Sequence, residues 1–217
     1  MNDQVQNQIT LHSSADCTLD RAASALANKL GLTCTSANGN NAGCAYQQKE
    51  NNTFGHLFNM QAGGVYAHTL EADGISVWFF DRDAIPGDIA AKTPDPSGWG
   101  TPTAYFPNTH CDIAAKFKKQ QLIFDTTLCG DWAGPAYAQS SCPGTCEDAV
   151  KNASNFDGTS FVFSVRAHCR RRCAAAARGP VLVTAVERRH GPGMDLTLTS
   201  SVPAVAQWKI ASVRIYQ

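Results

Sequence analysis

The chain has 217 residues, a length that one β domain can fill, and 43% of them are hydrophobic, which is enough to bury a core. Charged residues make up 17%, and this balance excludes a compositionally disordered chain. The formal net charge is zero, so neither nucleic acid nor an acidic membrane surface is expected as the main partner. No apolar run is long enough to span a bilayer.

Alternating and apolar runs predict β-strands along most of the chain. Residues 8–12 alternate with period two, and residues 63–68 follow a glycine turn. Residues 74–80 begin by alternating and end in a continuous apolar run, which indicates a strand buried on both faces, and residues 209–216 alternate cleanly. Long loops rich in Gly, Pro, Asn and Ser, such as 91–107, separate the strands. This pattern favours an antiparallel sandwich whose loops hold the function.

Three segments favour short helices, at about 19–30, 112–118 and 146–152. The first of them is rich in alanine and could equally be a loop. Another strand-like run, 122–125, leads into a glycine-flanked turn that Cys129 can fix, so Trp132 is expected on a rigid loop. A flat, amphipathic ring at the rim of a sheet is typical of a sugar-binding surface, although Trp132 could also cap the core.

Nine cysteines are many for a cytosolic chain, and most lie in polar, loop-like surroundings. Disulfides formed in an oxidising compartment explain them best, but the sequence leaves the pairing open. Metal binding is the alternative, because Cys142 and Cys146 are four residues apart, yet no second pair and no nearby His complete a zinc set. The sequons at Asn51 and Asn152 also fit a secreted protein. The residues after Met1 lack a signal-peptide pattern, which suggests that an N-terminal segment has been lost.

Residues 162–207 differ from the rest of the chain, being basic, rich in alanine and low in complexity. Without them, Phe161 would precede Trp208 in a natural loop-to-strand join. Valine codons begin with GT and one glutamine codon is CAG, the bases that open and close a eukaryotic intron. We therefore expect that an intron was translated in frame, and that it starts near Val162 or Val165 and ends at Gln207. A genuine surface insertion is the alternative, and a nucleic-acid patch is disfavoured because the arginines lack interleaved aromatics.

A set of motifs in fixed order gives a family resemblance. They include Asn-Gln-Ile-Thr-Leu-His at 7–12, Gly-Gly-Val-Tyr-Ala at 63–67 and Gly-Trp-Gly-Thr-Pro at 98–102. Further matches lie at 41–44, 75–80, 85–86, 111–113, 117–118, 124–127, 129–134, 141–143 and 213–217. Together they resemble the C-terminal part of fungal glycoside hydrolase family 16 enzymes of the endo-1,3(4)-β-glucanase (laminarinase) type. The likeness covers residues 2–161 and 208–217, so the chain is expected to be one partial domain, 1–217, interrupted at about 162–207.

The resemblance implies an all-β, concanavalin-like jelly-roll sandwich that is incomplete because its N-terminal strands are missing. It implies a concave sheet that holds β-glucan polysaccharide, an extracellular monomer with no nucleic-acid or membrane partner, and chemistry that needs neither cofactor nor metal. The family's reaction is retaining hydrolysis by two carboxylates. They belong to a Glu-x-Asp-x-x-Glu motif on one strand.

That motif is absent from the 217 residues, so no catalytic residue is assigned. Asp81-Arg82-Asp83 fits a turn, and Glu147-Asp148 adjoins a cysteine in a helix-like segment, so neither replaces it. In the family, a short link that ends in Asn-Asp-Gln follows the motif, and residues 2–4 match the end of this link. By this match, the acid/base Glu would lie before Met1. The chain as given is therefore expected to be inactive. A non-catalytic glucan-binding remnant and an unstable truncated product are the alternatives.

Three side chains are expected to contact substrate by their match to the family, namely His12, Trp132 and Trp99. His12 should face the sugar next to the scissile bond, or else be a satisfied strand histidine. Trp132 should stack on a glucose face. Trp99 could equally anchor its loop, and Trp78 is expected in the core. The family's Glu-Trp pair after 63–67 is replaced by Thr69-Leu70, which indicates the loss of one binding surface.

Overall fold

A computed structural model describes residues 7–37, 39–118, 120, 123, 129–140, 142–152 and 155, and the strand backbone at 167–169, 181–187 and 210–216. The side chains of Gly55, His56 and Trp132 lie outside this description. The chain divides into two compact units. The sheet unit consists of Gln6–Gln120, Ser164–Arg188 and Lys209–Gln217, and the helix unit consists of Met1–Val5, Gln121–Phe163 and Arg189–Trp208.

The smaller sheet of the sheet unit has three antiparallel strands in the order β1-β3-β2. Its strands are β1 (Gln8–Leu11), β2 (Asn28–Gly31) and β3 (Cys44–Gln47). The central strand β3 is buried at Cys44, Ala45 and Tyr46. A register shift between Lys29 and Gly31 bends β2 against it.

The larger sheet has six strands in the order β6-β5-β4-β8-β9-β7. Its members are β4 (Gly63–Glu71), β5 (Gly74–Asp81), β6 (Ala104–Pro107), β7 (Ala167–Cys169), β8 (Val181–Glu187) and β9 (Ile210–Tyr216). All neighbours are antiparallel except β7 and β9. The strands predicted at 8–12, 63–68, 74–80 and 209–216 are thus confirmed as β1, β4, β5 and β9, and the all-β prediction holds.

Strand β5 supplies side chains to two hydrophobic cores, one on each face of the larger sheet. Ile75 and Val77 pack on the cluster around Tyr46 and Phe106, whose rings meet edge to face at 5.2 Å. This core lies between the two sheets, and the Tyr46 hydroxyl donates to the Tyr105 carbonyl oxygen at 2.7 Å. The prediction that this strand is buried on both faces is confirmed.

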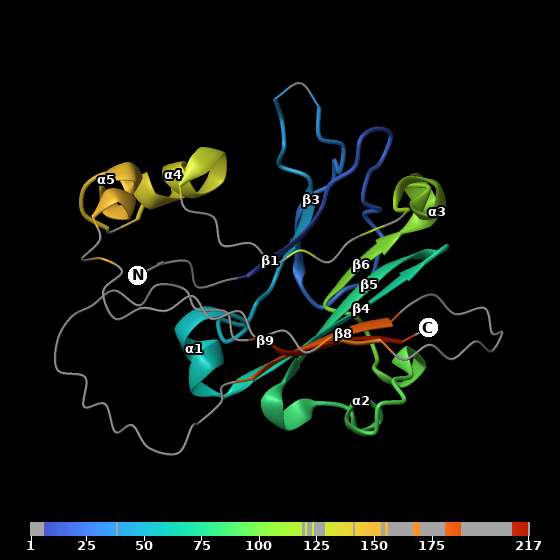
Figure 1. Ribbon diagram of the computed structural model, residues 1–217. Helices are drawn as coiled ribbons and strands as arrows, with labels where there is room; N and C mark the ends of the chain where they lie inside the picture. The colour runs from blue at the N-terminus through green and yellow to red at the C-terminus, as the bar shows by residue number, and fades with distance from the viewer. Residues whose placement is uncertain are drawn as a thin grey trace, which may run out of the picture. The chain divides into compact units, whose positions relative to one another are not determined.

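The second core lies on the opposite face of the larger sheet. There Phe80 packs with Trp99 on Val65, Ala67 and Ile89, the last of which belongs to α2 (Gly87–Ala90). In Figure 1 the three-stranded sheet and α2 lie on opposite sides of the larger sheet. The buried Trp78 ring meets Trp99 edge to face at 5.3 Å, which confirms Trp78 as a core residue.

Short helices and turns fill the remaining connections of the sheet unit. They are α1 (Gly55–Met60), α3 (Ile113–Lys116) and the 3₁₀ turns η1 (Arg82–Ala84), η2 (Pro96–Gly98) and η3 (Asn108–His110). The helix predicted at 112–118 is confirmed as α3, which Asp112 caps by accepting from the Ala115 N–H at 2.9 Å.

Two predictions for this unit are wrong in part. Residues 19–30 form no helix: Leu26 and Ala27 donate backbone bonds to the carbonyls of Pro102 and Thr103, and β2 follows. Tertiary pairing therefore overrides the helix propensity of an alanine-rich segment, and only the loop alternative fits it. The loop expected at 91–107 ends in strand β6, where Pro107 is tolerated because β6 is an edge strand.

The helix unit contains α4 (Gly130–Ala138) and α5 (Cys146–Lys151), which confirms the helix predicted at 146–152. The backbone of Trp132 belongs to α4, so the expected rigid loop is wrong; a helix forms through Pro135 in spite of its missing N–H. The expected fixing of this turn by Cys129 is confirmed, because Cys129 is bonded to Cys146. The strand predicted at 122–125 lies outside the described residues except for Ile123, which is exposed and belongs to no strand.

Two further disulfides lie in the sheet unit, joining Cys17 to Cys111 and Cys34 to Cys44. With the third, they confirm the prediction of disulfides and show that Cys146 is not a metal ligand together with Cys142. Among the described residues, no helix combines the length and the apolar character needed to cross a bilayer.

Candidate functional site

His12 stands where strand β1 ends, next to a loop that a disulfide closes. The side chain is exposed, and its Nδ1 lies 3.2 Å from the Ser36 hydroxyl. The following residue, Ser13, is buried, and its N–H donates to the Cys34 carbonyl oxygen at 2.9 Å. The Ser36 N–H returns a bond of 2.8 Å to the Ser13 carbonyl oxygen. His12 is therefore presented to solvent from a firmly paired backbone.

The loop from residue 34 to 44 begins and ends at a disulfide that lies against β1. Cys34 and Cys44 are almost fully buried, and Leu11 is paired with Cys44 in the sheet register. Gly43 adopts φ +70°, and a Cβ there would lie 2.7 Å from Cε1 of His12. Two residues of the loop therefore lie against the imidazole, Ser36 at Nδ1 and Gly43 beside Cε1.

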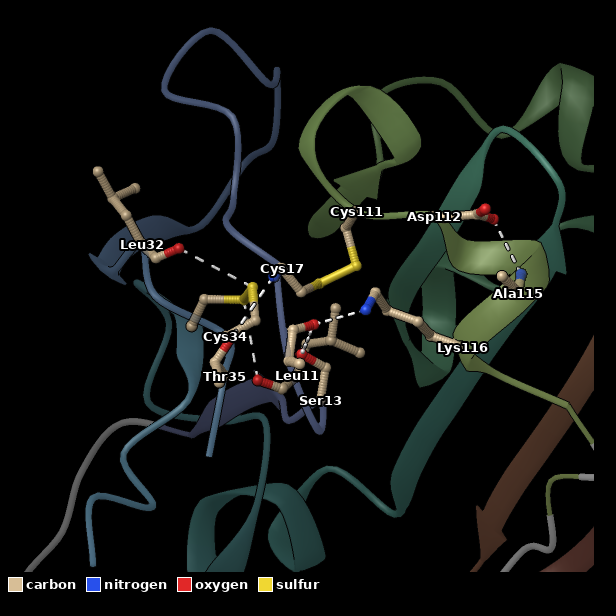
Figure 2. The surroundings of a disulfide bond; sticks show 12 residues. Leu11, Ser13, Cys17, Leu32, Cys34, Thr35, Cys111, Asp112, Ala115 and Lys116 are labelled. Carbon is tan, nitrogen blue, oxygen red and sulfur yellow. Dashed lines mark hydrogen bonds between the residues drawn. A yellow bond between two sulfur atoms is a disulfide. The ribbon is translucent and has the colours of Figure 1, made fainter. Parts of the chain in front are cut away.

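The Cys17–Cys111 disulfide lies next to the segment that contains Cys34 and stabilises the backbone near His12 (Figure 2). The Cys34 N–H donates to the Cys17 carbonyl oxygen at 2.9 Å, so the two disulfides lie on neighbouring segments. Lys116 of α3 donates from Nζ to the Ala15 carbonyl oxygen at 2.6 Å, which ties α3 to the turn after His12. The backbone around His12 is thus fixed by the two disulfides and by these hydrogen bonds.

Trp99 occupies a different layer of the sheet unit from His12. Its indole Nε1 donates to Asp88 Oδ2 at 2.8 Å, and its ring packs on Phe80 and Trp78 over the face of the larger sheet that α2 covers. No contact joins Trp99 to His12 among the described residues. These neighbours are those of a loop anchor, and a contact with substrate stays a prediction.

Trp132 belongs to the helix unit, in the first turns of α4. Its side chain lies outside the described residues, so the expected stacking on glucose also stays a prediction. Of the three expected residues, His12 and Trp99 are the two whose side chains the structure describes, and it does not bring these two into contact.

A polar cluster that no sequence motif indicates lies between the two sheets, around Tyr66 of β4. The Tyr66 hydroxyl accepts from Asn7 Nδ2 at 2.9 Å, donates to the Thr53 carbonyl oxygen at 2.6 Å and lies 3.1 Å from Gln48 Oε1. Burial raises the pKa of Tyr66 to about 12, so the hydroxyl keeps its proton at neutral pH. Isolated Asn and Gln residues in loops gave no sequence signal for such a cluster.

Two of the four carboxylates considered as substitutes for the missing motif, Asp81 and Asp148, have structural roles. Asp81 Oδ1 accepts from Asn52 Nδ2 at 3.0 Å and from Gln61 Nε2 at 2.9 Å, and the turn predicted after it is confirmed as η1. Asp148 lies in the first turn of α5, where its Oδ2 accepts from the Thr145 hydroxyl at 2.7 Å. What His12 and Ser36 can offer chemically is hydrogen bonding to the hydroxyls of a ligand.

Comparison with protein families gives a match over residues 1–167 to the catalytic domain of glycoside hydrolase family 16 described as XgeA-like. The chain belongs to glycoside hydrolase family 16. A probable glycosidase of Schizosaccharomyces pombe is 39% identical over 156 residues, which are 70% of this chain and 37% of that protein. The endo-1,3(4)-beta-glucanase xgeA of Emericella nidulans is 38% identical over 66% of this chain and 22% of its own length. The chain thus spans well under half the length of these two relatives.

Solved structures of family 16 enzymes agree with the fold. Laminarinase 16A from Phanerochaete chrysosporium, solved with two β-glucans in its donor and acceptor sites, is 38% identical with a TM-score of 0.61; the match covers 70% of this chain and 53% of that one. An elongating family 16 β-1,3-glucosyltransferase is 43% identical with a TM-score of 0.60, over 65% and 47%. The predicted jelly-roll fold and the family resemblance are both confirmed.

Proposed function

We propose that the ligand of this protein is β-1,3- or β-1,3(4)-glucan. The family-level role is hydrolysis of O-glycosyl bonds in that polysaccharide. The observation that supports this most is the match of residues 1–167 to a family 16 catalytic domain. Glucan as the ligand is further supported by the laminarinase neighbour, whose structure contains β-glucans. The exposed imidazole of His12 and the indoles of Trp99 and Trp132 are the proposed substrate contacts.

We propose further that the 217-residue chain binds glucan without hydrolysing it. Retaining hydrolysis needs two carboxylates close together. The sequence contains no Glu-x-Asp-x-x-Glu motif, and the candidate substitutes at Asp81 and Asp148 are engaged in a turn and a helix cap. Neither offers a free pair for acid and nucleophile.

Retention on insoluble β-1,3-glucan tests the binding proposal. The purified chain should be retained and then released by soluble laminarin, and His12→Ala should reduce the retention. Ser14→Ala, at an exposed serine two residues away, is the matched control and should be retained like the wild type. If neither laminarin nor His12→Ala changes the retention, the binding proposal is wrong.

The glucosyltransferase neighbour supports a second candidate activity, transfer of glucosyl units to a glucan acceptor. The two reactions share a glycosyl donor and differ in whether water or a sugar accepts it. Incubation with laminari-oligosaccharides, followed by analysis of chain lengths, distinguishes hydrolysis by shorter products and transfer by longer ones. For the 217-residue chain we expect neither.

We also propose that the protein is an extracellular monomer. The three disulfides support an oxidising location, because they persist where thiols are not kept reduced. Native mass spectrometry of protein collected from culture medium would test both statements, and a dimer or a fully reduced cytosolic form would contradict them.

A further inference from the structure

We propose that Ser36 and Gly43, held by the Cys34–Cys44 disulfide, fix the imidazole of His12 with Nε2–H presented to a glucan chain. The inference rests on the proposed glucan binding and adds the residues that position its contact. In this arrangement the Ser36 hydroxyl donates to Nδ1, and Nε2 carries the ring proton.

The first support is the hydrogen bond at Nδ1. Ser36 Oγ lies 3.2 Å from Nδ1 of His12, and a serine hydroxyl can rotate to donate or accept. A neutral imidazole has one N–H and one acceptor nitrogen, and the partner of one nitrogen sets the state of the other. Donation from Ser36 agrees with the intrinsic preference of neutral imidazole for the Nε2–H tautomer. Among the described residues Nε2 has no hydrogen-bond partner, so it remains available to a ligand.

The second support is the close approach of Gly43 to the ring. A Cβ at this position would lie 2.7 Å from Cε1 of His12 and 2.7 Å from the Leu11 carbonyl oxygen. Real Cβ atoms do not approach so closely, so any larger residue must displace the imidazole or the end of β1. Gly43 therefore leaves room for the ring in the position at which Nδ1 lies beside Ser36.

The third support is that the loop bearing both residues has fixed ends. Cys34 and Cys44 are 10 residues apart, buried and disulfide-bonded, and the backbone of Ser36 is paired with Ser13. Side chains that must bind in one orientation are most effective when their own supports are rigid. Ser36 and Gly43 are thus positioning residues, and of these three residues only His12 touches the ligand.

The test is the ¹⁵N spectrum of the His12 ring in the full 217-residue chain, assigned by its loss in His12→Gln. The wild type should show Nδ1 as an unprotonated acceptor and Nε2 as the N–H. Ser36→Ala should return the ring to a mixture of tautomers, and Ser36→Thr should restore the single form. A wild-type ring with the proton on Nδ1, or a Ser36→Ala spectrum identical to wild type, would overturn the proposal.

Two glycine variants test the steric part. Gly43→Ala should shift the His12 ring signals and weaken binding of laminarihexaose by about 2- to 10-fold, a range that corresponds to one hydrogen bond. Gly39→Ala is the matched control, because Gly39 also has a positive φ, +79°, but a Cβ there meets nothing within 4 Å. Equal effects of the two variants on the His12 signals would contradict the proposal.

The same samples separate this inference from the proposed function. If His12→Gln leaves the affinity for laminarihexaose unchanged while Ser36→Ala alters the ring spectrum, the positioning of the ring stands and its role in glucan binding fails. If His12→Gln weakens binding but Ser36→Ala leaves the spectrum unchanged, glucan binding stands and the positioning inference is wrong.

Discussion

At the scale of single residues, Tyr66 links the two sheets through the most connected hydroxyl among the described residues. It accepts from Asn7 and donates to the Thr53 carbonyl oxygen, within reach of Gln48. Tyr66→Phe would leave these buried groups without a partner, and an unsatisfied buried group costs about 1–3 kcal/mol. We predict a loss of that size in the free energy of unfolding, measured by urea denaturation.

Tyr105→Phe is the control for this prediction. The Tyr105 hydroxyl lies 3.5 Å from the Asp73 carbonyl oxygen at the surface, which is too long for a strong hydrogen bond. Its removal should change the free energy of unfolding by less than about 0.5 kcal/mol. A comparable loss in the two variants would contradict the role assigned to Tyr66.

His68 of β4 predicts a dependence of stability on pH. Burial lowers the pKa of His68 below its ordinary value of 6.5, so the unfolded chain takes up a proton at a higher pH than the folded chain does. Above pH 6.5 the residue is neutral in both states and contributes nothing. As the pH falls below 6.5, the free energy of unfolding should decrease, until the pH reaches the folded-state pKa.

Urea denaturation at pH 7.5 and at pH 5 measures this effect. The decrease in the free energy of unfolding between the two pH values should be smaller in His68→Gln than in the wild type. His110→Gln, at an exposed histidine, should behave like the wild type. An identical decrease in His68→Gln and wild type would exclude the burial of His68 as a cause.

At the scale of elements, the disulfides of the sheet unit differ in the length of chain that they close. Cys17–Cys111 spans 94 residues and Cys34–Cys44 spans 10. In the chain-entropy account, these lengths correspond to about 4.7 and about 2.7 kcal/mol. We predict that Cys17→Ala/Cys111→Ala lowers the free energy of unfolding by about 2 kcal/mol more than Cys34→Ala/Cys44→Ala does.

Urea denaturation of both double variants checks this order. The shorter bridge should matter less for stability and more for the position of His12. If removing Cys34–Cys44 destabilises the chain more than removing Cys17–Cys111, loop closure does not explain the contribution of these disulfides.

The elements that could be predicted from sequence are those whose side-chain pattern agrees with their final packing. Strand β5 ends in a continuous apolar run because Val77 and Trp78 enter different cores, and this run is visible in the sequence. Helix α4 could not be predicted, because Gly134 and Pro135 are turn signals and the disulfide at Cys129 that fixes its start is not readable from spacing.

The same limit applies to the candidate site. His12 was expected from the family resemblance, but its neighbours Ser36 and Gly43 approach it only because Cys34 pairs with Cys44. Sequence alone permits several pairings of nine cysteines, so it could not place these residues beside His12.

At the scale of the whole molecule, residues 162–207 contain strands β7 and β8 of the larger sheet. The family match ends at residue 167, while β8 within this segment lies between β4 and β9 in the larger sheet. We propose that the segment is a translated intron. A variant that joins Phe161 directly to Trp208 should then fold, with β9 pairing with β4, and should melt at a temperature no lower than that of the full chain.

Circular dichroism with a thermal melt tests this deletion. An unfolded deletion variant would favour a genuine insertion, because β8 would then be an essential strand of the sheet. Sequencing of the transcript is an independent check, since messages that mostly retain these codons would contradict the intron proposal.

We propose that this family 16 chain binds β-1,3-glucan through a surface that includes His12 and does not cleave the polysaccharide. Isothermal titration of laminarihexaose into the 217-residue protein, with reducing ends counted in the same sample afterwards, tests it most directly. We predict saturable heat, weaker binding by His12→Ala, and no new reducing ends. Absence of binding, or measurable release of reducing ends by the purified chain, would contradict it.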